Sequence, residues 1–341
     1  MNLLIFTQKV DKGDDNLGFF HEWLKKFAEK TDRVFVVANF VGEHNLPANV
    51  EVFSLGKEKK FGRIRRYLNF YKYLFSILSK ADAVFVHMIP AWVVFIWPAA
   101  VLYRKPIFLW YTHKSVTFSL RVAEKLTAKI FTASPESCRL NSQKIVVTGH
   151  GIDTNRFAPR RETLKSEKNT LKLLSVGRIS ESKNYEFLID VVSVLVKQER
   201  NAILDIVGAP ITKLDFLYKK KLENLIAEKN LRNNINFIGA KTYDEMLDVY
   251  NGHDVLLHAS ETGSLDKAVL EAMACGLPVL TTSEAFSGML DVLPKDANLI
   301  AGRIAHLNRD LPVRQAGMSL RKIVVDNHNL DNLVEKIIKN L

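Results

Sequence analysis

The chain has 341 residues, of which 47% are hydrophobic and 25% charged, with 16 Gly and 10 Pro. This composition excludes disordered and collagen-like classes, and the length predicts two folded domains, since a domain usually takes about 150 residues. The net charge of +11 is uneven: residues 1–150 carry 22 Lys and Arg against 12 Asp and Glu, whereas residues 151–341 carry 26 against 25. We therefore expect the first half to face something anionic, namely nucleic acid, an acidic lipid surface or a phosphorylated substrate.

The cysteine content indicates a reducing compartment. Cys138 and Cys275 are the two cysteines, and the sequence has no CxxC pair and no Cys/His cluster at metal-ligand spacing. We therefore expect neither a disulfide framework nor a structural zinc. The apolar run at residues 3–6 is too short for the hydrophobic part of a signal peptide, so we expect a cytoplasmic protein.

Short β-branched or aromatic runs alternate with amphipathic segments along the chain, which is typical of βαβ units. Near-continuous apolar strands such as 83–86 indicate parallel sheets covered on both faces. The expected strands fall into two series: 2–6, 34–38, 83–87, 107–111, 130–133 and 145–148, then 172–177, 203–207, 235–238, 255–258 and 279–282. We therefore predict an α/β protein with two Rossmann-like, doubly wound parallel-sheet domains that face a central cleft.

The polar, charged segment 158–170 separates the two series and is interpreted as a linker. It divides a domain at 1–157 from a second domain at 171–328. The final segment, 329–341, is expected to form a helix that packs back on the first domain. Because open α/β sheets bind ligands beyond the carboxyl ends of their strands, the cleft is the expected site.

Residues 88–103 contain no charged or strongly polar side chain. A helix that spans a bilayer needs about 20 apolar residues, and this shorter run is interrupted by Pro90 and Pro98. We expect a buried or interfacial helix here rather than a membrane span.

Residues 57–80 hold eight Lys and Arg against one acid, Glu58, with aromatic residues between them. Helical spacing joins five apolar residues into a stripe beside a cationic face: Ile64, Leu68, Tyr71, Phe75 and Leu78. Three interpretations stay open. The segment is an ordinary surface helix with its stripe in the core, a helix on an anionic membrane surface, or a nucleic-acid-binding segment whose aromatic rings stack on bases.

The segment 176–183 (VGRISESK) carries the first candidate chemistry, at the end of an expected strand and the start of a helix. A glycine turn lets the backbone approach a ligand, and Arg178 and Lys183 would neutralise a diphosphate. The alternative is a solvated loop in which Ser182 caps the next helix.

The second candidate segment is 261–279 (ETGSLDKAVLEAMACGLPV). We expect Ser264 to be the N-cap of a helix that ends at Gly276, and the N-terminus of that helix would form an anion site beyond the strand 255–258. Glu271 lies among apolar residues and needs a partner. Ribose hydroxyls are one candidate, and an exposed helix face is the alternative.

In this order, the VGR segment with its lysine and the Gly/Ser loop before EAMACGLPV resemble the motifs of the retaining glycosyltransferases of family 4, which have the GT-B fold. GIDTNRFAP (151–159) and LWYTHKSV (109–116) resemble further segments of that family, the second more loosely. The resemblance extends over nearly the whole chain. It implies a nucleotide-diphosphate-sugar donor, UDP- or GDP-linked, and no cofactor.

The resemblance also implies roles for individual residues. Arg178 and Lys183 would bind the donor diphosphate and Glu271 the nucleotide ribose. His113 would reach the transferred sugar, unless it is a structural histidine at a strand end. The remaining expected donor contacts are Gly177, Thr262, Gly263, Ser264 and Leu265, with Ala240 and Lys241 beside the base and Thr242 and Glu245 forming a capping box for the next helix.

The sequence departs from the family pattern at two positions. Gly263 stands where the family commonly has a glutamate, eight positions before Glu271, so a carboxylate for the sugar hydroxyls is missing unless Glu261 or Asp266 replaces it. Asn184 stands where a glycine usually follows the lysine, a change that a helix start should tolerate. The first departure leaves donor identity and catalysis open.

The loop 11–18 follows the first expected strand, where the family has a glycine-rich loop near the donor phosphate and the acceptor. It has neither the usual Gly-Gly pair nor a GxGxxG motif, which argues against a dehydrogenase. Gly13, Asp14 and Asn16 are the candidate contacts to a phosphate or a sugar acceptor. The alternative is that these polar residues only cap the helix beginning near Leu17.

The sequence contains no DxD motif, so we expect Arg178 and Lys183 to act without a metal. The pattern implies retention by same-face attack, with no protein nucleophile. Together with the basic first half, it predicts a transferase that adds sugar to a lipid-linked or cell-envelope glycan acceptor at the inner face of the cell membrane. The alternatives are a catalytically inactive sugar-nucleotide-binding protein and a basic nucleic-acid-binding protein, although nucleic acid is not the expected partner.

Overall fold

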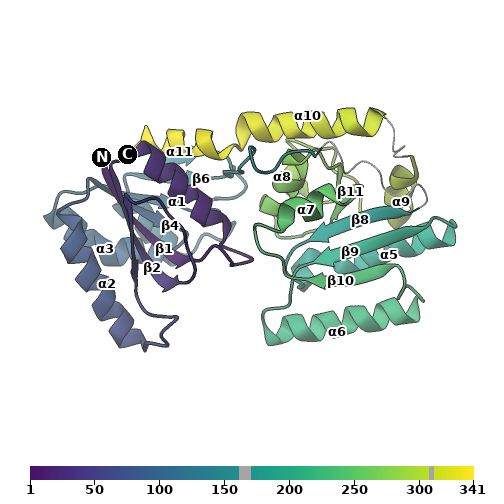
Figure 1. The fold of residues 1–341 in the computed structure, drawn as a ribbon, viewed down its shortest axis with the longest axis horizontal. Helices are drawn as coiled ribbons and strands as arrows, with labels where there is room; N and C mark the ends of the chain where they lie inside the picture. The colour runs from purple at the N-terminus through teal and green to yellow at the C-terminus, as the bar shows by residue number, and fades with distance from the viewer. Residues whose placement is uncertain (161–169, 307–310) are drawn as a thin grey trace. The chain divides into compact units, whose positions relative to one another are not determined.

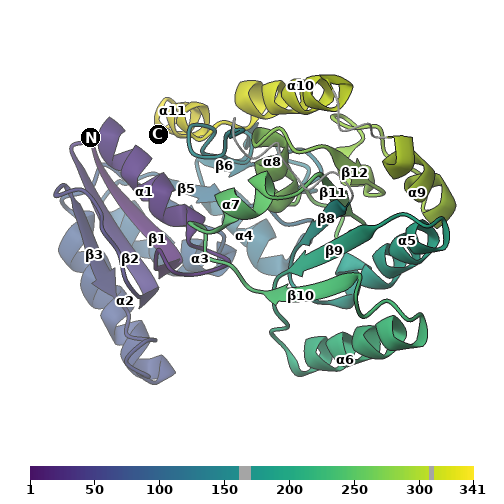
Figure 2. The same ribbon diagram turned by 45° about the vertical axis from the view of Figure 1, so that its right-hand side comes forward.

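The computed structural model describes residues 1–160, 170–306 and 311–341. They divide into two compact units, a first unit of Met1–Asp153 with Asn327–Leu341 and a second unit of Thr154–Asp326. Each unit is built on a parallel sheet with helices against it (Figures 1 and 2). Most of the expected linker, at 161–169, lies outside the described residues.

The first unit contains a seven-stranded sheet in the order β3-β2-β1-β4-β5-β6-β7, and every neighbouring pair runs parallel. Its strands are β1 Asn2–Val10, β2 Arg33–Val41, β3 Val50–Ser54, β4 Ala83–His87, β5 Ile107–Trp110, β6 Lys129–Thr132 and β7 Ile145–Val147. Its helices are α1 Phe19–Lys30, α2 Arg63–Leu78, α3 Pro90–Leu102, α4 Phe118–Leu126 and α11 Leu330–Ile338.

The alternation of side chains along β1 places apolar residues on both faces of this sheet. Leu4 and Phe6 belong to a core with α2, α3 and α4, whereas Leu3 and Ile5 belong to a core with α1 and α11. Helix α11 lies beside α1 (Figure 1), and Lys26 of α1 pairs with Asp331 at 2.9 Å. The last residues of the chain therefore complete the core of the first unit.

The second unit has a five-stranded parallel sheet in the order β10-β9-β8-β11-β12. Its strands are β8 Leu171–Val176, β9 Ala202–Val207, β10 Ile235–Gly239, β11 Val255–His258 and β12 Val279–Thr281. Its α-helices are α5 Tyr185–Lys197, α6 Lys213–Glu228, α7 Met246–Asn251, α8 Lys267–Ala274, α9 Ala297–His306 and α10 Leu311–Asn327, with short 3-10 turns η1 Glu181–Lys183 and η2 Glu284–Phe286. The order is again doubly wound, because the chain reverses direction across the sheet after β10.

All eleven strands expected from the sequence are present, with ends within a few residues of the expected ones. The sequence analysis did not predict β3. This edge strand (VEVFS) is only half buried. Glu51 interrupts its apolar run, and its sequence pattern is therefore weak.

The buried face of helix α2 is not the one expected from the sequence. The residues that it buries are Phe70, Leu74, Ile77 and Leu78. Four members of the expected stripe are instead exposed, with relative exposures of 80% for Ile64, 66% for Leu68, 39% for Tyr71 and 49% for Phe75. The interpretation that placed the stripe in the core is therefore wrong. Periodicity alone could not choose between two apolar faces of the same helix.

Residues 90–102 form the helix α3, which buries Val93, Ile96 and Ala100 in the core of the first unit. Pro98 lies inside this helix. Across the described parts of the chain, no helix combines the length and apolar character that a membrane span requires.

Candidate functional site

Three glycine turns meet at the carboxyl edge of the second sheet, after β8, β9 and β10. Gly177, Gly208 and Gly239 all have positive φ, at 155°, 145° and 85°. The Gly208 N–H donates to the Gly239 carbonyl at 2.9 Å, and a Cβ on Gly208 would lie 2.0 Å from the Gly177 oxygen. Glycine is therefore required where these turns approach one another. The sequence analysis selected Gly177 and the turn with Ala240 and Lys241, which follows Gly239, but missed Gly208, whose signal is its place directly after an apolar strand.

Lys183 crosses the first of these turns. Its Cε lies 3.0 Å from the position that a Cβ on Gly177 would occupy, so a larger residue at 177 would displace the lysine. The Lys183 ammonium donates to Asp266 Oδ2 at 2.6 Å, and both side chains are mostly buried. Asn184 follows with φ 54° and ψ 50°, in the left-handed region. This geometry explains why a glycine suits the position and why asparagine, the side chain that best tolerates it, can replace it.

Asp266 holds a second partner besides Lys183. His258 Nε2 lies 2.6 Å from the same Oδ2 atom, and His258 Nδ1 lies 2.9 Å from Thr281 Oγ1. Burial works to raise the pKa of Asp266, but the hydrogen bond with His258 and the charge of Lys183 outweigh it and hold that pKa well below its ordinary value. The sequence analysis missed His258, although its position at the last residue of β11 is a usable signal.

Arg178 extends from the same strand end as Lys183. Its side chain is about half exposed, and Nε lies 3.9 Å from Asp215 Oδ2. Asp215 belongs to the capping box that begins α6, where it accepts from the Thr212 and Ile211 N–H groups. These backbone hydrogen bonds, with a smaller contribution from the Arg178 charge, lower the pKa of Asp215. Arg178 therefore remains accessible to an anion at this edge.

The loop before α8 lies against the turn that carries Lys183. The Glu261 N–H donates to the Ser182 carbonyl at 2.9 Å, and Asn184 Nδ2 donates to Glu261 Oε1 at 3.3 Å. The helix begins at Lys267 with Asp266 as its N-cap residue, so the expectation that Ser264 caps it is wrong. The Asp266 side chain makes no capping hydrogen bond and is instead bound by Lys183. Ser182 likewise does not cap α5, which Asn184 precedes without a side-chain cap.

The other loop residues selected from the sequence lie close to this turn in the chain. Thr262 Oγ1 is 3.0 Å from Ser260 Oγ, and Leu265 is buried. Gly263 has φ 65°, a left-handed conformation that disfavours any residue with a Cβ. The conformation at position 263 therefore favours the glycine found here over the glutamate that family 4 commonly has there. Of its two possible replacements, Asp266 is bound by Lys183 and His258, and Glu261 pairs with Lys295 at 2.9 Å.

Glu271 has partners within the second unit. Its Oε1 lies 2.5 Å from the Lys267 ammonium, and its Oε2 accepts from the Tyr250 hydroxyl at 2.9 Å. Burial and the neighbouring carboxylate raise the pKa of Tyr250 well above its ordinary value, which keeps this hydroxyl a donor. The buried carboxylate is thus satisfied by the protein, and a ribose hydroxyl would be an additional partner.

The turn expected beside the base lies after β10. Ala240 is exposed, and Lys241 pairs with Glu245 at 2.9 Å. The Thr242 N–H donates to Glu245 Oε2 at 2.8 Å, but α7 begins only at Met246 and has no side-chain cap. The expected capping box is therefore incomplete, because Thr242 Oγ1 also donates to Glu245 instead of accepting from its N–H group.

The remaining candidates lie in the first unit. Asp14 pairs with Lys9 and accepts from the N–H groups of Asn16 and Leu17, so it stabilises the turn before α1. Gly13 and Asn16 are exposed in the same loop. His113 is exposed after β5, and its Nδ1 accepts from the Ser115 N–H at 3.1 Å.

Within the described residues, no three His, Cys, Asp or Glu side chains gather in a way that could hold a metal ion. The candidate residues brought together by the second unit are therefore two cations, three glycine turns and the start of α8. This combination of cations, glycine turns and a helix N-terminus suits an anionic ligand such as a diphosphate.

Comparison with known proteins agrees with this chemistry. Residues 157–305 match the family model for glycosyl transferases group 1. A protein named as a colanic acid biosynthesis glycosyltransferase, WcaL of Escherichia coli (strain K12), is 29% identical over 160 residues, 45% of this chain and 37% of that protein. Mannosylfructose-phosphate synthase of Agrobacterium fabrum is 25% identical over 155 residues, 43% of this chain and 34% of that protein. The chain thus spans about two fifths of the length of the first curated relatives that it matches.

Solved structures show the same architecture. Anabaena HepE in complex with UDP and glucose has a TM-score of 0.77 and 18% identity, covering 98% of both chains. Sucrose-phosphate synthase from Thermosynechococcus elongatus has a TM-score of 0.76 and 15% identity, covering 99% of this chain and 98% of that one. The protein therefore has the GT-B fold, which confirms the fold expected from the sequence. The match to the glycosyl transferases group 1 model, at residues 157–305, lies within the second unit.

Proposed function

We propose that this protein is a retaining, metal-independent glycosyltransferase that moves a sugar from a nucleotide-diphosphate sugar to a lipid-linked or cell-envelope glycan acceptor. The observation that carries the proposal is the placement of Lys183 across the Gly177 turn, beside the start of α8 and at the same strand end as Arg178. The group 1 domain match and the UDP in the HepE structure support a nucleotide-sugar donor.

The chemistry asked of these residues is electrostatic. As the bond between the anomeric carbon and the donor phosphate oxygen breaks, negative charge collects on the departing diphosphate. Arg178 and Lys183 neutralise that charge, and the loss of one such donor typically raises a barrier by about 3 to 4 kcal/mol. The acceptor hydroxyl forms its new bond on the same face of the sugar and passes its proton to the leaving phosphate. No protein nucleophile takes part.

The other candidates have supporting roles in this proposal. Glu271 binds the ribose, and the turn at Ala240 and Lys241 lies beside the base. The loop 262–265 provides backbone contacts to the sugar and phosphate, and His113 contacts the transferred sugar. Gly13, Asp14 and Asn16 form a loop for the acceptor or phosphate.

Two measurements test the donor part of the proposal. Thermal unfolding in the presence of UDP, GDP, ADP and their sugars should show stabilisation by one nucleotide family, since a ligand stabilises the state that binds it. Incubation with the stabilising nucleotide sugar and EDTA should then give donor hydrolysis or transfer. Stabilisation without any turnover would instead identify a binding protein that has lost catalysis, and no stabilisation by any nucleotide would refute a sugar-nucleotide site.

We further propose that α2 binds an anionic membrane surface at the cytoplasmic face. Its exposed apolar residues Ile64 and Leu68 alternate with the basic Arg63 and Arg65, and residues 57–80 carry eight Lys and Arg against one acid. An exposed helix face with both properties suits a lipid surface, because apolar groups enter the interface while cations meet anionic headgroups.

Flotation with vesicles containing phosphatidylglycerol tests this surface. Exchange of Ile64 and Leu68 for serine should abolish flotation, and vesicles of phosphatidylcholine alone should bind weakly. Leu214 and Leu217 of α6 are matched controls, since they are exposed by 76% and 66% but lie in a segment of nearly balanced charge. An equal loss of flotation after exchange of Leu214 and Leu217 for serine would contradict the assignment of α2 to lipid. So would a salt-sensitive electrophoretic shift with DNA that persists after the exchange in α2.

A further inference from the structure

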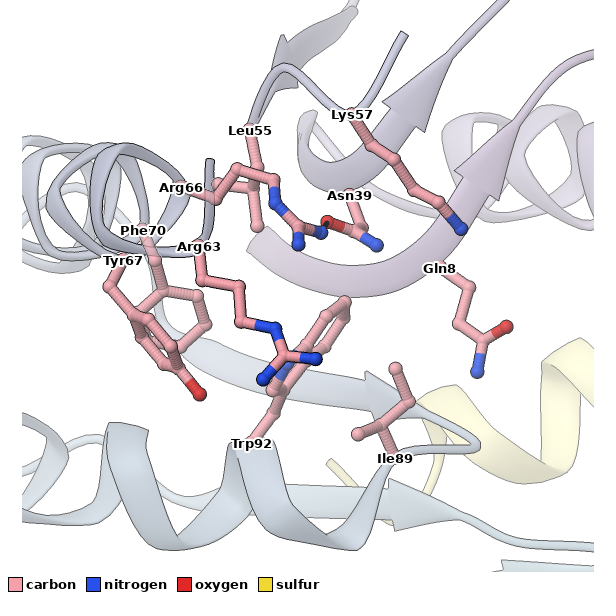
Figure 3. A pocket seen from close by; sticks show the side chains of 10 residues that line it. All are labelled: Gln8, Asn39, Leu55, Lys57, Arg63, Arg66, Tyr67, Phe70, Ile89 and Trp92. Carbon is pink, nitrogen blue, oxygen red and sulfur yellow. Dashed lines mark hydrogen bonds between the residues drawn. The ribbon is translucent and has the colours of Figure 1, made fainter. Parts of the chain in front are cut away.

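The first unit contains a pocket that the donor chemistry does not use. It has a volume of about 430 Å³ and lies at the carboxyl edge of the first sheet, lined by Gln8 of β1, Asn39 of β2 and Ile89 after β4 (Figure 3). The first turns of α2 and α3 close its sides with Arg63 and Trp92. In doubly wound sheets this edge is where ligands bind.

The pocket is strongly cationic. Lys57, Arg63 and Arg66 line it, and no carboxylate is among the lining residues. Within the described residues, Lys57 and Arg63 make no ion pair, so their charges are not compensated by a neighbouring acid. Glu58 is the acid nearest in sequence, but its carboxylate accepts from the Val41 N–H and the Ser54 hydroxyl.

One polar atom in this wall lacks a partner. Arg66 Nη1 donates to Asn39 Oδ1 at 2.8 Å, which orients the guanidinium, but Arg66 Nε is buried and makes no hydrogen bond. A buried donor without a partner is costly, so the Arg66 guanidinium is only partly satisfied by the protein. Figure 3 shows the side chains of Arg63, Lys57 and Gln8 around the pocket.

The rest of the wall is apolar and continues onto the exposed face of α2. Trp92 is held by edge and tilted contacts to Phe6 and Phe70, at 6.2 Å between ring centroids in each case. Tyr67 lines the pocket and is itself 49% exposed. Ile64 and Tyr71 lie three residues before and four residues after it, on neighbouring turns of the helix. A ligand with a charged group in the pocket can therefore extend an apolar part along α2.

We propose that this pocket binds a phosphate group carried by the acceptor. The inference rests on the proposed transferase function and adds the chemical class of its acceptor. Lys57, Arg63 and Arg66 bind the phosphate oxygens, and Trp92 and Tyr67 contact the group to which the phosphate is joined. Such a phosphate occurs on an amphiphilic lipid phosphate or on a free sugar phosphate, and the two sources differ in their use of Tyr67 and Ile64.

Calorimetric titration of the full chain without donor tests the pocket. The probes are octyl phosphate against octyl glucoside, both below their micellar concentrations, and glucose 6-phosphate against glucose. We expect at least one phosphate probe to bind more tightly than its neutral counterpart. Arg63→Ala and Lys57→Ala, which change exposed side chains, should each weaken binding at least tenfold. Lys72→Ala removes an exposed cation of α2 outside the pocket and should change binding less than twofold.

The two arms identify the source of the phosphate. Preference for octyl phosphate that Tyr67→Ser reduces indicates a lipid phosphate, whereas equal or tighter binding of glucose 6-phosphate indicates a sugar phosphate. If neither phosphate binds, or if Arg63→Ala and Lys72→Ala weaken binding equally, the proposal that the pocket binds phosphate is wrong. Binding with the expected losses, in a protein that transfers no sugar, would retain the pocket and reject the transferase. Melting curves followed by circular dichroism verify that each variant is folded.

Discussion

The Lys183 ammonium lies 2.6 Å from the Asp266 carboxylate, and this contact joins the turn after β8 to the N-cap residue of α8. Two segments separated by 83 residues are thereby held at one sheet edge. His258 binds the same carboxylate oxygen, so Lys183 is fixed before a ligand arrives. A diphosphate would find the cation already in place, which lowers the cost of ordering it during catalysis.

Replacing either cation should slow donor turnover. We expect Arg178→Ala and Lys183→Ala each to reduce donor turnover at least a hundredfold, since each removes a charge that stabilises the leaving diphosphate. Initial rates with radiolabelled donor, in EDTA, measure the effect. Lys220→Ala removes an exposed cation of α6 and should leave the rate unchanged. Unaltered rates in both test variants would refute the assignment.

Asp266→Asn should destabilise the second unit by about 3 to 5 kcal/mol, because it leaves Lys183 buried without its anion. Hydrogen exchange read by mass spectrometry should show faster exchange in peptides from β8 and α8, with β1 and β2 of the first unit as internal controls. The double variant Lys183→Met with Asp266→Asn should lose less than the sum of the single changes, since neither charge remains. Additive losses would contradict a direct interaction between the two side chains.

Gly263→Glu restores the carboxylate that the family commonly has, but we expect it to destabilise the protein. The backbone there has φ 65°, where a residue with a Cβ costs about 1 to 2 kcal/mol. Gly263→Asn should lower the melting temperature less, since asparagine tolerates this conformation best. Thermal unfolding and transfer assays compare the two. Undiminished stability together with faster transfer in Gly263→Glu would show that a missing carboxylate limits the activity.

His87 should make the first unit sensitive to acid. Its ring is fully buried against Phe20, at 4.1 Å between ring centroids, and its Nε2 has no hydrogen-bond partner among the described residues. Burial lowers the pKa of His87 to about 3 from an ordinary value of 6.5. The neutral ring is thus favoured by folding. The contribution of the neutral His87 ring to the free energy of unfolding is complete above pH 6.5. It falls by about 1.4 kcal/mol for each pH unit as pH decreases toward 3.

The measurement is urea unfolding followed by tryptophan fluorescence between pH 7 and pH 4.5, since all four tryptophans lie in the first unit. His87→Gln should flatten the dependence, because an amide does not titrate. His328, whose pKa burial lowers to about 4, titrates over part of the same range, and His328→Gln therefore removes a separate share. Parallel curves for wild type and His87→Gln would contradict the prediction.

Much of the fold could be predicted because the local signals were strong. Buried parallel strands such as β4 are continuous apolar runs bounded by polar turns, and their alternation with helices implies the doubly wound sheets. The half-buried β3 has no such signal. The core face of α2 was likewise ambiguous, since both Ile64 with Leu68 and Phe70 with Leu74 follow a helical period. Only the neighbouring elements decide which of two apolar faces is covered.

The candidate site divides in the same way. The sequence alone determined the residue types and their order: a glycine turn with Arg178 and Lys183, then a short helix ending before Pro278. Tertiary structure decided which groups meet. It joined Asp266 to both Lys183 and His258, moved the N-cap of the helix from Ser264 to Asp266, and gathered Lys57 and Arg63 around a pocket. These contacts link distant segments across sheet edges, and their geometry depends on strand order and packing, which local sequence patterns do not encode.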